Sequence, residues 1–301
     1  MLLIKNARLS MEDSKVSDIL IDGGKIIRIG GNIEVEGAEV IEAGGLLTTS
    51  GLVGYCSPET EGAVARFTPG IRAIEELDLF GRELIFYLNQ GITSIVVHPK
   101  NNNLISGSVC VVKTHEVLIE DYVIKEDAAI RVILGGDEGL GERMAEIRSF
   151  IELLGEYRKG KEVAGREGLK VRFTEKILRK RHPVIFRAES SSAVLDAVRL
   201  IERYNLSGVV ETSVENRYTL KALEDERIHT IRERRDAPPH NLEELQEALE
   251  FNRRITRFLN IDHRVGEICV GMDADIVIWE EDPLEAVSVI IDGNLIGRIN
   301  R

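Results

Sequence analysis

The sequence predicts an α/β protein in which the two chain ends combine into a second, smaller β domain. Strand-like runs between turn signals fill the first 48 residues, and similar runs return near the C-terminus. The stretch between them alternates strand-like and helix-like segments, which indicates parallel strands joined by helical crossovers. We therefore expect a composite β-sandwich domain from residues 1–48 and 264–301. Residues 49–263 should form an α/β domain, either a barrel or an open sheet.

The β-runs at the two ends have the same texture. At the start they are LLIKNARLS (2–10), SDILIDGGKIIRIG (17–30), in which DGGK is a natural hairpin turn, and AEVIEAGGLL (38–47). At the end they are RVGEICVGMDADIVIWEEDP (264–283) and VSVIIDGNLIGRIN (287–300). The hexamer IDGGKI near the start is echoed by IDGNLI near the end. This similarity is why we expect both ends to share one domain.

The middle of the chain divides into strands and helices of ordinary length. Val194, Leu195, Val198 and Ile201 have the spacing of one buried helix face, and Asn241 is a suitable N-cap. The stretch GSVCVVKTHEVLIEDYVIK reads as a β-rich insert between the second and third strands. We expect strands at 51–56, 93–98, 129–134, 183–188 and 208–212, helices at 73–90, 140–157, 191–205 and 241–259, and a further strand near 228–234.

Composition limits the classes of function. The 301 residues carry a net charge of −12, which argues against nucleic acid as the partner, and the basic stretch 158–181 reads as a solvated helical face. No segment is long and apolar enough to span a membrane. Three widely spaced cysteines suit a reducing compartment, so we expect a cytoplasmic protein. Charged residues make up 30% of the chain, as in many thermophilic proteins.

Several segments resemble one family. The strongest are HRVGEICVGMDADIVIWEEDPLE at the end and VIEAGGLLTTSGLVG near the start, followed by YLNQGITSIVVHP and HPVIFRAESSSAVLDAVRLIERYNL in the middle. They are similar to the amidohydrolase superfamily, the metal-dependent hydrolases that include dihydroorotases and imidazolonepropionases. This resemblance covers nearly the whole chain. It implies a (β/α) barrel in which hydroxide held on a divalent metal attacks a carbonyl or amide.

The positions that bind metal in this family are occupied differently here. The resemblance implies a His-x-His motif after the first barrel strand, but GLVGYCSP places Cys56 and Pro58 there. At the next ligand strand IFRAE places Arg187 and Glu189 at the histidine positions, and ETSV places Thr212 where another histidine is expected. Neither proline nor arginine can ligate a metal in a protein. We therefore expect the metal centre to be lost and no cofactor to bind, with one divalent metal such as zinc as the alternative.

Two pairs of charged residues are the remaining site candidates. Lys125 and Glu126 match a family segment that holds a ligand in active relatives, and we expect them to form a salt-bridged pair. Arg187 and Glu189 point the same way on a strand and should form a buried ion pair, the alternative being an anion-binding arginine in a reused ligand pocket.

Two further arrangements have a weaker basis in the sequence. A metal site formed by His98 and His115 stays open as a minor alternative. Cys56 as a nucleophile would need a nearby base, and the sequence offers none.

The chain is short for the barrel that the resemblance implies. About 50 residues separate Thr212 from the closing β segment, which leaves no room for the family's strand-eight aspartate. We therefore expect a truncated TIM-like barrel of about six strands. The exposed gap should be covered by the helix at 241–259 or by a second subunit, so we also expect a homo-oligomer, most simply a dimer.

These observations favour a non-catalytic function. We expect an amidohydrolase-like pseudoenzyme that binds a small molecule or acts as a structural or regulatory subunit. The alternative is a hydrolase of non-peptide C–N bonds, in cyclic amides or N-acyl compounds, that works with an atypical metal site or none. Family resemblance alone is a weak argument for activity.

Overall fold

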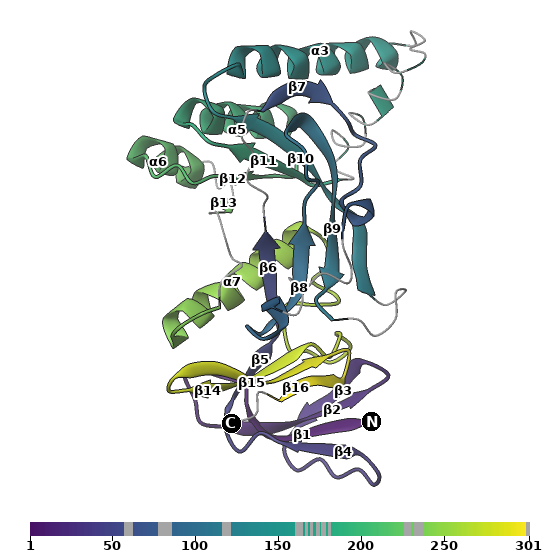
Figure 1. Ribbon diagram of the computed structural model, residues 1–301, viewed down its shortest axis with the longest axis vertical. Coiled ribbons are helices and arrows are strands. Elements are labelled where there is room, and N and C mark those ends of the chain that lie inside the picture. The colour runs from purple at the N-terminus through teal and green to yellow at the C-terminus, as the bar shows by residue number, and fades with distance from the viewer. Residues whose placement is uncertain are drawn as a thin grey trace.

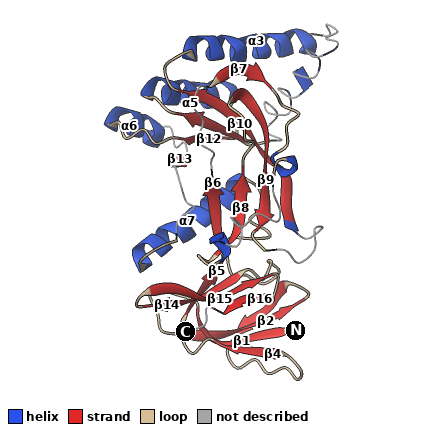
Figure 2. Ribbon diagram, in the orientation of Figure 1, coloured by secondary structure: helices blue, strands red, loops and turns tan. Residues whose placement is uncertain are grey.

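The structure is a computed structural model that describes residues 1–56, 63–77, 86–115, 122–159, 182–225, 230–231 and 238–298, with 165, 168, 171–172, 175 and 179. These residues form two eight-stranded sheets, one above the other in Figure 1, with the helices packed on the upper one (Figure 2). Most of the basic stretch 158–181 and part of the strand expected near 228–234 lie outside the described residues. None of the described helices is both long enough and apolar enough to cross a membrane.

Strands from both ends of the chain lie in one sheet, which we call the composite sheet. Its order is β16-β15-β14-β5-β1-β2-β3, with β4 paired to β1. One face is built from aliphatic side chains such as Ile4, Ile21 and Ile276, and residues that alternate with them, such as Leu20 and Val277, are buried on the opposite face. Its members are β1 (Leu2–Arg8), β2 (Val16–Asp22), β3 (Lys25–Gly30), β4 (Glu39–Glu42), β5 (Leu47–Ser50), β14 (Ile276–Glu281), β15 (Leu284–Ile291) and β16 (Asn294–Arg298).

The second sheet is curled into a half-barrel. Its order is β13-β12-β11-β10-β9-β8-β6, with β7 paired to β9, so β6 and β13 end the path. Strands β6, β8, β10, β11, β12 and β13 run parallel, in agreement with the barrel of about six strands that the sequence predicts. The members are β6 (Leu52–Cys56), β7 (Val64–Phe67), β8 (Ile92–Val97), β9 (Asn103–Lys113), β10 (Val123–Gly135), β11 (Val184–Ala188), β12 (Gly208–Glu211) and β13 (Thr230–Ile231).

Helices cover both faces of the half-barrel sheet. On the outer face α3 (Leu140–Arg158), α5 (Ser191–Tyr204) and α6 (Arg217–Asp225) share an apolar core with the strands. On the inner face α7 (Leu242–Phe258) contributes Phe251 and Ile255 to a second core. The predicted cap of α7 is confirmed, since Asn241 accepts a hydrogen bond from the Glu244 backbone N–H at 2.9 Å.

Two predictions of local structure were confirmed only in part. The β-rich stretch is not an insert, because β9 lies inside the sheet between β8 and β10 and runs antiparallel to both. Short connections permit this, since antiparallel neighbours need no helical crossover. Of the helix expected at 73–90, η1 (Ala73–Glu75) is a short 3₁₀ turn, residues 86–88 are helical, and residues 78–85 lie outside the described part. Strand β7 and helix α6 were not predicted.

Helix α7 covers the free edge of β6 through one side chain. The Asn252 amide donates to the Gly51 carbonyl at 3.0 Å and accepts from the Val53 N–H at 2.8 Å. These are backbone groups that a neighbouring strand would otherwise engage, so an amide side chain supplies the hydrogen bonds of the missing strand. The expectation that the helix at 241–259 covers a barrel gap is therefore confirmed at this edge.

A buried lysine joins the two sheets. Lys113, at the end of β9, is 1% exposed and contacts three aspartates of the composite-sheet region. Its Nζ lies 2.6 Å from Asp275, 2.9 Å from Asp292 and 3.0 Å from Asp273. Asp273 also pairs with Arg264 at 2.9 Å and with Lys25. We call this group the junction cluster, because it fixes the half-barrel sheet against the composite sheet.

Candidate functional site

A buried cluster of polar side chains lies near the carboxyl ends of the parallel strands, inside the half-barrel. We call it the barrel cluster. Alternation along each strand places its members on the inner face, above the apolar core that faces α7. The carboxyl ends of parallel strands are where sites form in barrel enzymes, so the position is that of a candidate site. The cluster consists of Tyr55, His98, Arg131, Arg187 and Glu211, all of which are buried.

Glu211 is the centre of this cluster. One of its carboxylate oxygens accepts a hydrogen bond from the Tyr55 hydroxyl at 2.9 Å, and the other lies 2.5 Å from an Arg187 guanidinium nitrogen. A guanidinium nitrogen of Arg131 is 4.0 Å from the same oxygen. Both oxygens are therefore engaged by protein groups, and two guanidinium charges surround a single buried carboxylate.

The expected ion pair between Arg187 and Glu189 is present. Arg187 Nε donates to Glu189 at 3.0 Å. The Arg187 side chain is 7% exposed, whereas that of Glu189 is 33% exposed, so the pair connects the cluster to the surface. Arg187 therefore binds two carboxylates, that of the buried Glu211 and that of the partly exposed Glu189. Its charge is balanced within the protein.

Burial governs the titration of the cluster. Desolvation, followed by the charge of Glu211, raises the pKa of Tyr55 well above its usual value, so the phenol stays neutral. Desolvation also lowers the pKa of Arg131. Desolvation, followed by the charge of Arg131, lowers the pKa of His98 to about 3. His98 is thus a neutral imidazole, and neither of its ring nitrogens has a hydrogen-bond partner among the described residues.

We predict that His98 makes the protein sensitive to acid. Because its pKa is about 3 in the fold and 6.5 in the unfolded chain, the unfolded state binds more protons between these values. Stability is therefore lost as the pH falls below 6.5, by about 2 kcal/mol at pH 5. Urea denaturation at pH 7.5 and pH 5 should show that the stability of the parent, relative to that of His98→Met, is lower by about 2 kcal/mol at the lower pH.

The matched control for this prediction is His240→Gln, because His240 is exposed. Burial raises the pKa of Asp275 to about 6, an effect that makes stability fall as pH rises from 4 to 6. Comparing parent and variant at each pH cancels this opposite contribution. An identical pH dependence in His98→Met and the parent would contradict the assignment.

The other predicted residues do not join the barrel cluster. Lys125 donates to the Leu259 carbonyl at 2.7 Å, and Glu126 pairs with Arg72, so the expected Lys125–Glu126 salt bridge was wrong. Burial lowers the pKa of Lys125. The Thr212 hydroxyl accepts from the Val214 N–H at 3.1 Å in a local turn.

The remaining predictions concern Cys56, Pro58 and the pairing of His98 with His115. The backbone of Cys56 ends β6, but its side chain and Pro58 lie outside the described residues. The suggested meeting of His98 and His115 was wrong. Thr114, beside His115, pairs with Thr93 at the start of β8, whereas His98 follows its end.

The side chains of the barrel cluster do not fit a divalent metal. Guanidinium groups offer no lone pair, and both oxygens of Glu211 already bind protein donors. His98 alone has the character of a metal ligand. Within the described ranges, no group of three or more His, Cys, Asp or Glu side chains is placed to hold a metal ion. The donor set therefore differs from the one that the family resemblance implies.

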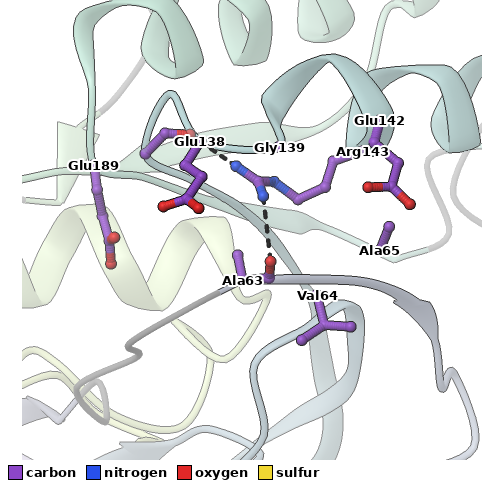
Figure 3. Close-up of a pocket in the computed structure, with 9 residues that line it drawn as sticks. Ala63, Val64, Ala65, Glu138, Gly139, Glu142, Arg143 and Glu189 are labelled. Atoms are coloured by element: carbon purple, nitrogen blue, oxygen red, sulfur yellow. Dashed lines mark hydrogen bonds between the residues drawn. The ribbon is translucent and has the colours of Figure 1, made fainter.

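A pocket opens beside this cluster. Its volume is about 590 Å³, and it lies between β7, the ends of β10 and β11 and the start of α3 (Figure 3). Glu189 lines it, and the Glu189 backbone N–H bonds to the Gly135 carbonyl, which joins the two strand ends. Glu138, Glu142 and Arg143 are the other charged residues of its wall. The Glu189–Arg187 pair thus connects the pocket to the barrel cluster.

Sequence reasoning identified Arg187 and Glu189 but missed Tyr55, Arg131 and Glu211. The missed residues stand next to apolar positions in β6, β10 and β12 and have no motif of their own. A usable signal was that successive side chains of a strand point to opposite faces of the sheet. Tyr55 and Glu211 each stand one residue before a predicted site residue, Cys56 and Thr212. Thr212 was one position out of phase with the inner face, whereas Arg187 was in phase with it.

Comparison with solved structures identifies the fold. An amidohydrolase from Thermotoga maritima MSB8 aligns with a TM-score of 0.75 at 22% identity, over 99% of this chain and 100% of that chain. An L-hydantoinase (dihydropyrimidinase) from Arthrobacter aurescens aligns with a TM-score of 0.57 at 13% identity, over 100% and 96% of the two chains. A D-hydantoinase from Thermus sp. gives 0.55 at 14% identity, over 99% and 95%. These similarities confirm the amidohydrolase resemblance at the level of the fold.

Sequence comparison gives a shorter match. No protein-family model matches the chain. A dihydroorotase from Lactococcus lactis is 49% identical over 55 residues, and one from Streptococcus pneumoniae is 50% identical over 56 residues. The matches cover 17% and 18% of this chain and 13% of each dihydroorotase. They support the same resemblance over a small part of the molecule.

Proposed function

We propose that this chain, built on the amidohydrolase fold, is a non-catalytic homologue that binds a small molecule or serves as a regulatory subunit. The observation that supports this most directly is the barrel cluster. Arg187 occupies a position where the family resemblance implies a metal ligand, and it binds Glu211 at 2.5 Å and Glu189 at 3.0 Å. We infer that a permanent protein cation takes over the role of the metal cation that the family resemblance implies.

Electrostatics explains why such an exchange would be stable. A buried carboxylate without a partner is strongly destabilising, and two guanidinium groups compensate Glu211 in this fold. The same two charges would repel a divalent cation placed beside them. The cluster is therefore complete without a metal, and the neighbouring pocket remains available to a ligand.

The second candidate is a hydrolase of non-peptide C–N bonds with an atypical metal site or none. One observation favours it: His98 is neutral and buried in the cluster, and its ring nitrogens have no partner among the described residues. A neutral imidazole can accept a proton or hold a metal. The hydantoinase and dihydroorotase similarities suggest which substrates to assay.

Metal analysis and activity assays distinguish the two candidates. The protein is purified without chelator, dialysed against zinc and then analysed for bound metal. It is also assayed with dihydroorotate, hydantoin and N-acyl amino acids. We expect zinc far below one atom per chain and no turnover above the blank. Stoichiometric zinc together with turnover that a chelator abolishes would reject the non-catalytic function.

The oligomeric state belongs to the same proposal. We propose a homodimer in which the second subunit covers the half-barrel near β13, because α7 engages the other edge, at β6, within one chain. This edge is short in the described part of the chain, and unpaired strand edges are usually covered.

A further inference from the structure

The pocket beside Glu189 contains a buried cation that pairs with carbonyl groups. Arg143, in the first turn of α3, is 3% exposed. Its Nε donates to the Leu134 carbonyl at 2.7 Å, and one terminal nitrogen donates to the Gly136 carbonyl at 2.7 Å. The other terminal nitrogen donates to the Ala63 carbonyl at 3.2 Å (Figure 3). Each acceptor is a backbone carbonyl. The guanidinium therefore has no carboxylate partner among the described residues.

Arg143 lines the pocket and retains some hydrogen-bonding capacity. A guanidinium has about five N–H donors, and the three contacts to carbonyls leave about two of them. Because a buried donor without an acceptor is costly, these N–H groups favour a ligand with an acceptor. The start of α3 adds positive electrostatic potential at the same wall. This part of the pocket suits an anionic group.

The loop before α3 is shaped around this guanidinium. Gly139 has φ +66°, and a Cβ there would lie 3.0 Å from a terminal nitrogen of Arg143. Gly135 has φ +63°, and its Cβ would lie 2.8 Å from the Ala63 side chain. Both positions therefore require glycine for conformational and steric reasons. Backbone carbonyls hold the arginine in a defined place, and the nearest negative charges belong to the glutamates of the pocket wall.

Two carboxylates flank Arg143 in the pocket wall. Glu138 and Glu142 lie on either side of Arg143 in the view of Figure 3, and both are exposed. Neither forms an ion pair with a described residue, whereas Glu189 is held by Arg187. The carboxylates are spread along the cavity and do not converge on a point, in keeping with the lack of a metal-holding group within the described ranges. An extended organic molecule fits this spacing better than an ion.

We propose that this pocket binds a free α-amino acid with a basic side chain. Its carboxylate would bind Arg143, and its two ammonium groups would face Glu138 and Glu142. One guanidinium and two carboxylates then meet one carboxylate and two ammonium groups, so the charges are complementary. The cavity of about 590 Å³ is in the size range of small-molecule sites. This inference rests on the proposed ligand-binding function and names its ligand class.

A matched set of compounds tests the proposal by isothermal titration calorimetry of the full chain. L-Lysine is the probe, norleucine lacks the side-chain amine, cadaverine lacks the carboxylate and hexanoate lacks both amines. Each lost charge-assisted contact should weaken binding about tenfold or more. We expect lysine to bind most tightly, norleucine and cadaverine to bind at least about tenfold more weakly, and hexanoate not to bind.

One carboxylate variant and a matched control complete the test. Glu138→Gln should weaken lysine binding about tenfold, whereas Glu152→Gln on the exposed side of α3 should not change it. Cadaverine that binds as tightly as lysine, unchanged affinity in Glu138→Gln, or no binding by any compound would each overturn the proposal. Calorimetry does not depend on turnover, so bound zinc with activity would reject the proposed function without changing this result.

Discussion

Replacing Lys113 by methionine is expected to lower the free energy of unfolding by about 3–5 kcal/mol. The ammonium group is the shared partner of Asp273, Asp275 and Asp292, at 2.6–3.0 Å, and its side chain is 1% exposed. Methionine matches the shape of the lysine stem but leaves buried carboxylates without this cation. The variant should also loosen the contact between the two sheets.

The pH dependence of this variant gives an internal check. Burial already raises the pKa of Asp275 to about 6, and the Lys113 charge opposes that rise. Without the lysine, the aspartates of the junction cluster should bind protons more readily in the fold. Because the folded state then binds more protons than the unfolded state, stability falls as pH rises. The difference between parent and Lys113→Met should therefore shrink from pH 8 to pH 5.

Urea denaturation is the suitable measurement, since a neutral denaturant does not screen the ion pairs. Lys221→Met is the control, because Lys221 is exposed on α6 and its loss should change stability by no more than about 0.5 kcal/mol. A loss below about 1 kcal/mol in Lys113→Met would show that the junction cluster contributes little to the fold.

Replacing Asn252 by alanine is expected to cost about 2–4 kcal/mol of stability. Asn252 is 1% exposed, and its amide makes one hydrogen bond to Gly51 and one to Val53 at the edge of β6. Alanine leaves one buried N–H and one buried carbonyl of β6 without partners, and buried backbone groups are rarely left so. Helix α7 would still be held by Phe251 and Ile255, so the loss should be partial.

Two further variants locate the effect at the strand edge. Asn252→Asp keeps an acceptor for the Val53 N–H but loses the donor to Gly51 and buries a negative charge, so it should be at least as unstable as Asn252→Ala. Gln246→Ala, on the exposed face of α7, should be neutral within about 0.5 kcal/mol. Equal stability of Asn252→Ala and the parent in urea would contradict the edge-covering role.

The local pattern of apolar and capping residues in the sequence predicted the parallel strands and most of the helices. The apolar run before Cys56 became β6, the periodic run 191–205 became α5, and the capped run after Asn241 became α7. These segments have hydrophobic periodicity and capping residues that agree with their tertiary position. The β-rich stretch was misread because a strand pattern indicates that a strand forms but not which neighbour it pairs with.

The candidate site was predicted only in part, for the same reason. Arg187 and Glu189 are two residues apart on one strand, so their contact follows from local geometry. The contacts of Glu211 with Arg187, Tyr55 and Arg131 join residues from four strands. Their distances depend on how strongly the sheet curls, which no single segment encodes.

The sequence by itself determined most of the elements, the resemblance to amidohydrolases and the replacement of the expected histidines by Arg187 and Glu189. Only the tertiary structure decided which charges neutralise one another. The curl of the sheet brings Glu211 to Arg187, the docking of the two sheets brings three aspartates to Lys113, and α7 brings Asn252 to β6. The physical reason is that local propensity acts over a few residues, whereas the energy of a buried charge depends on every group that the fold places around it.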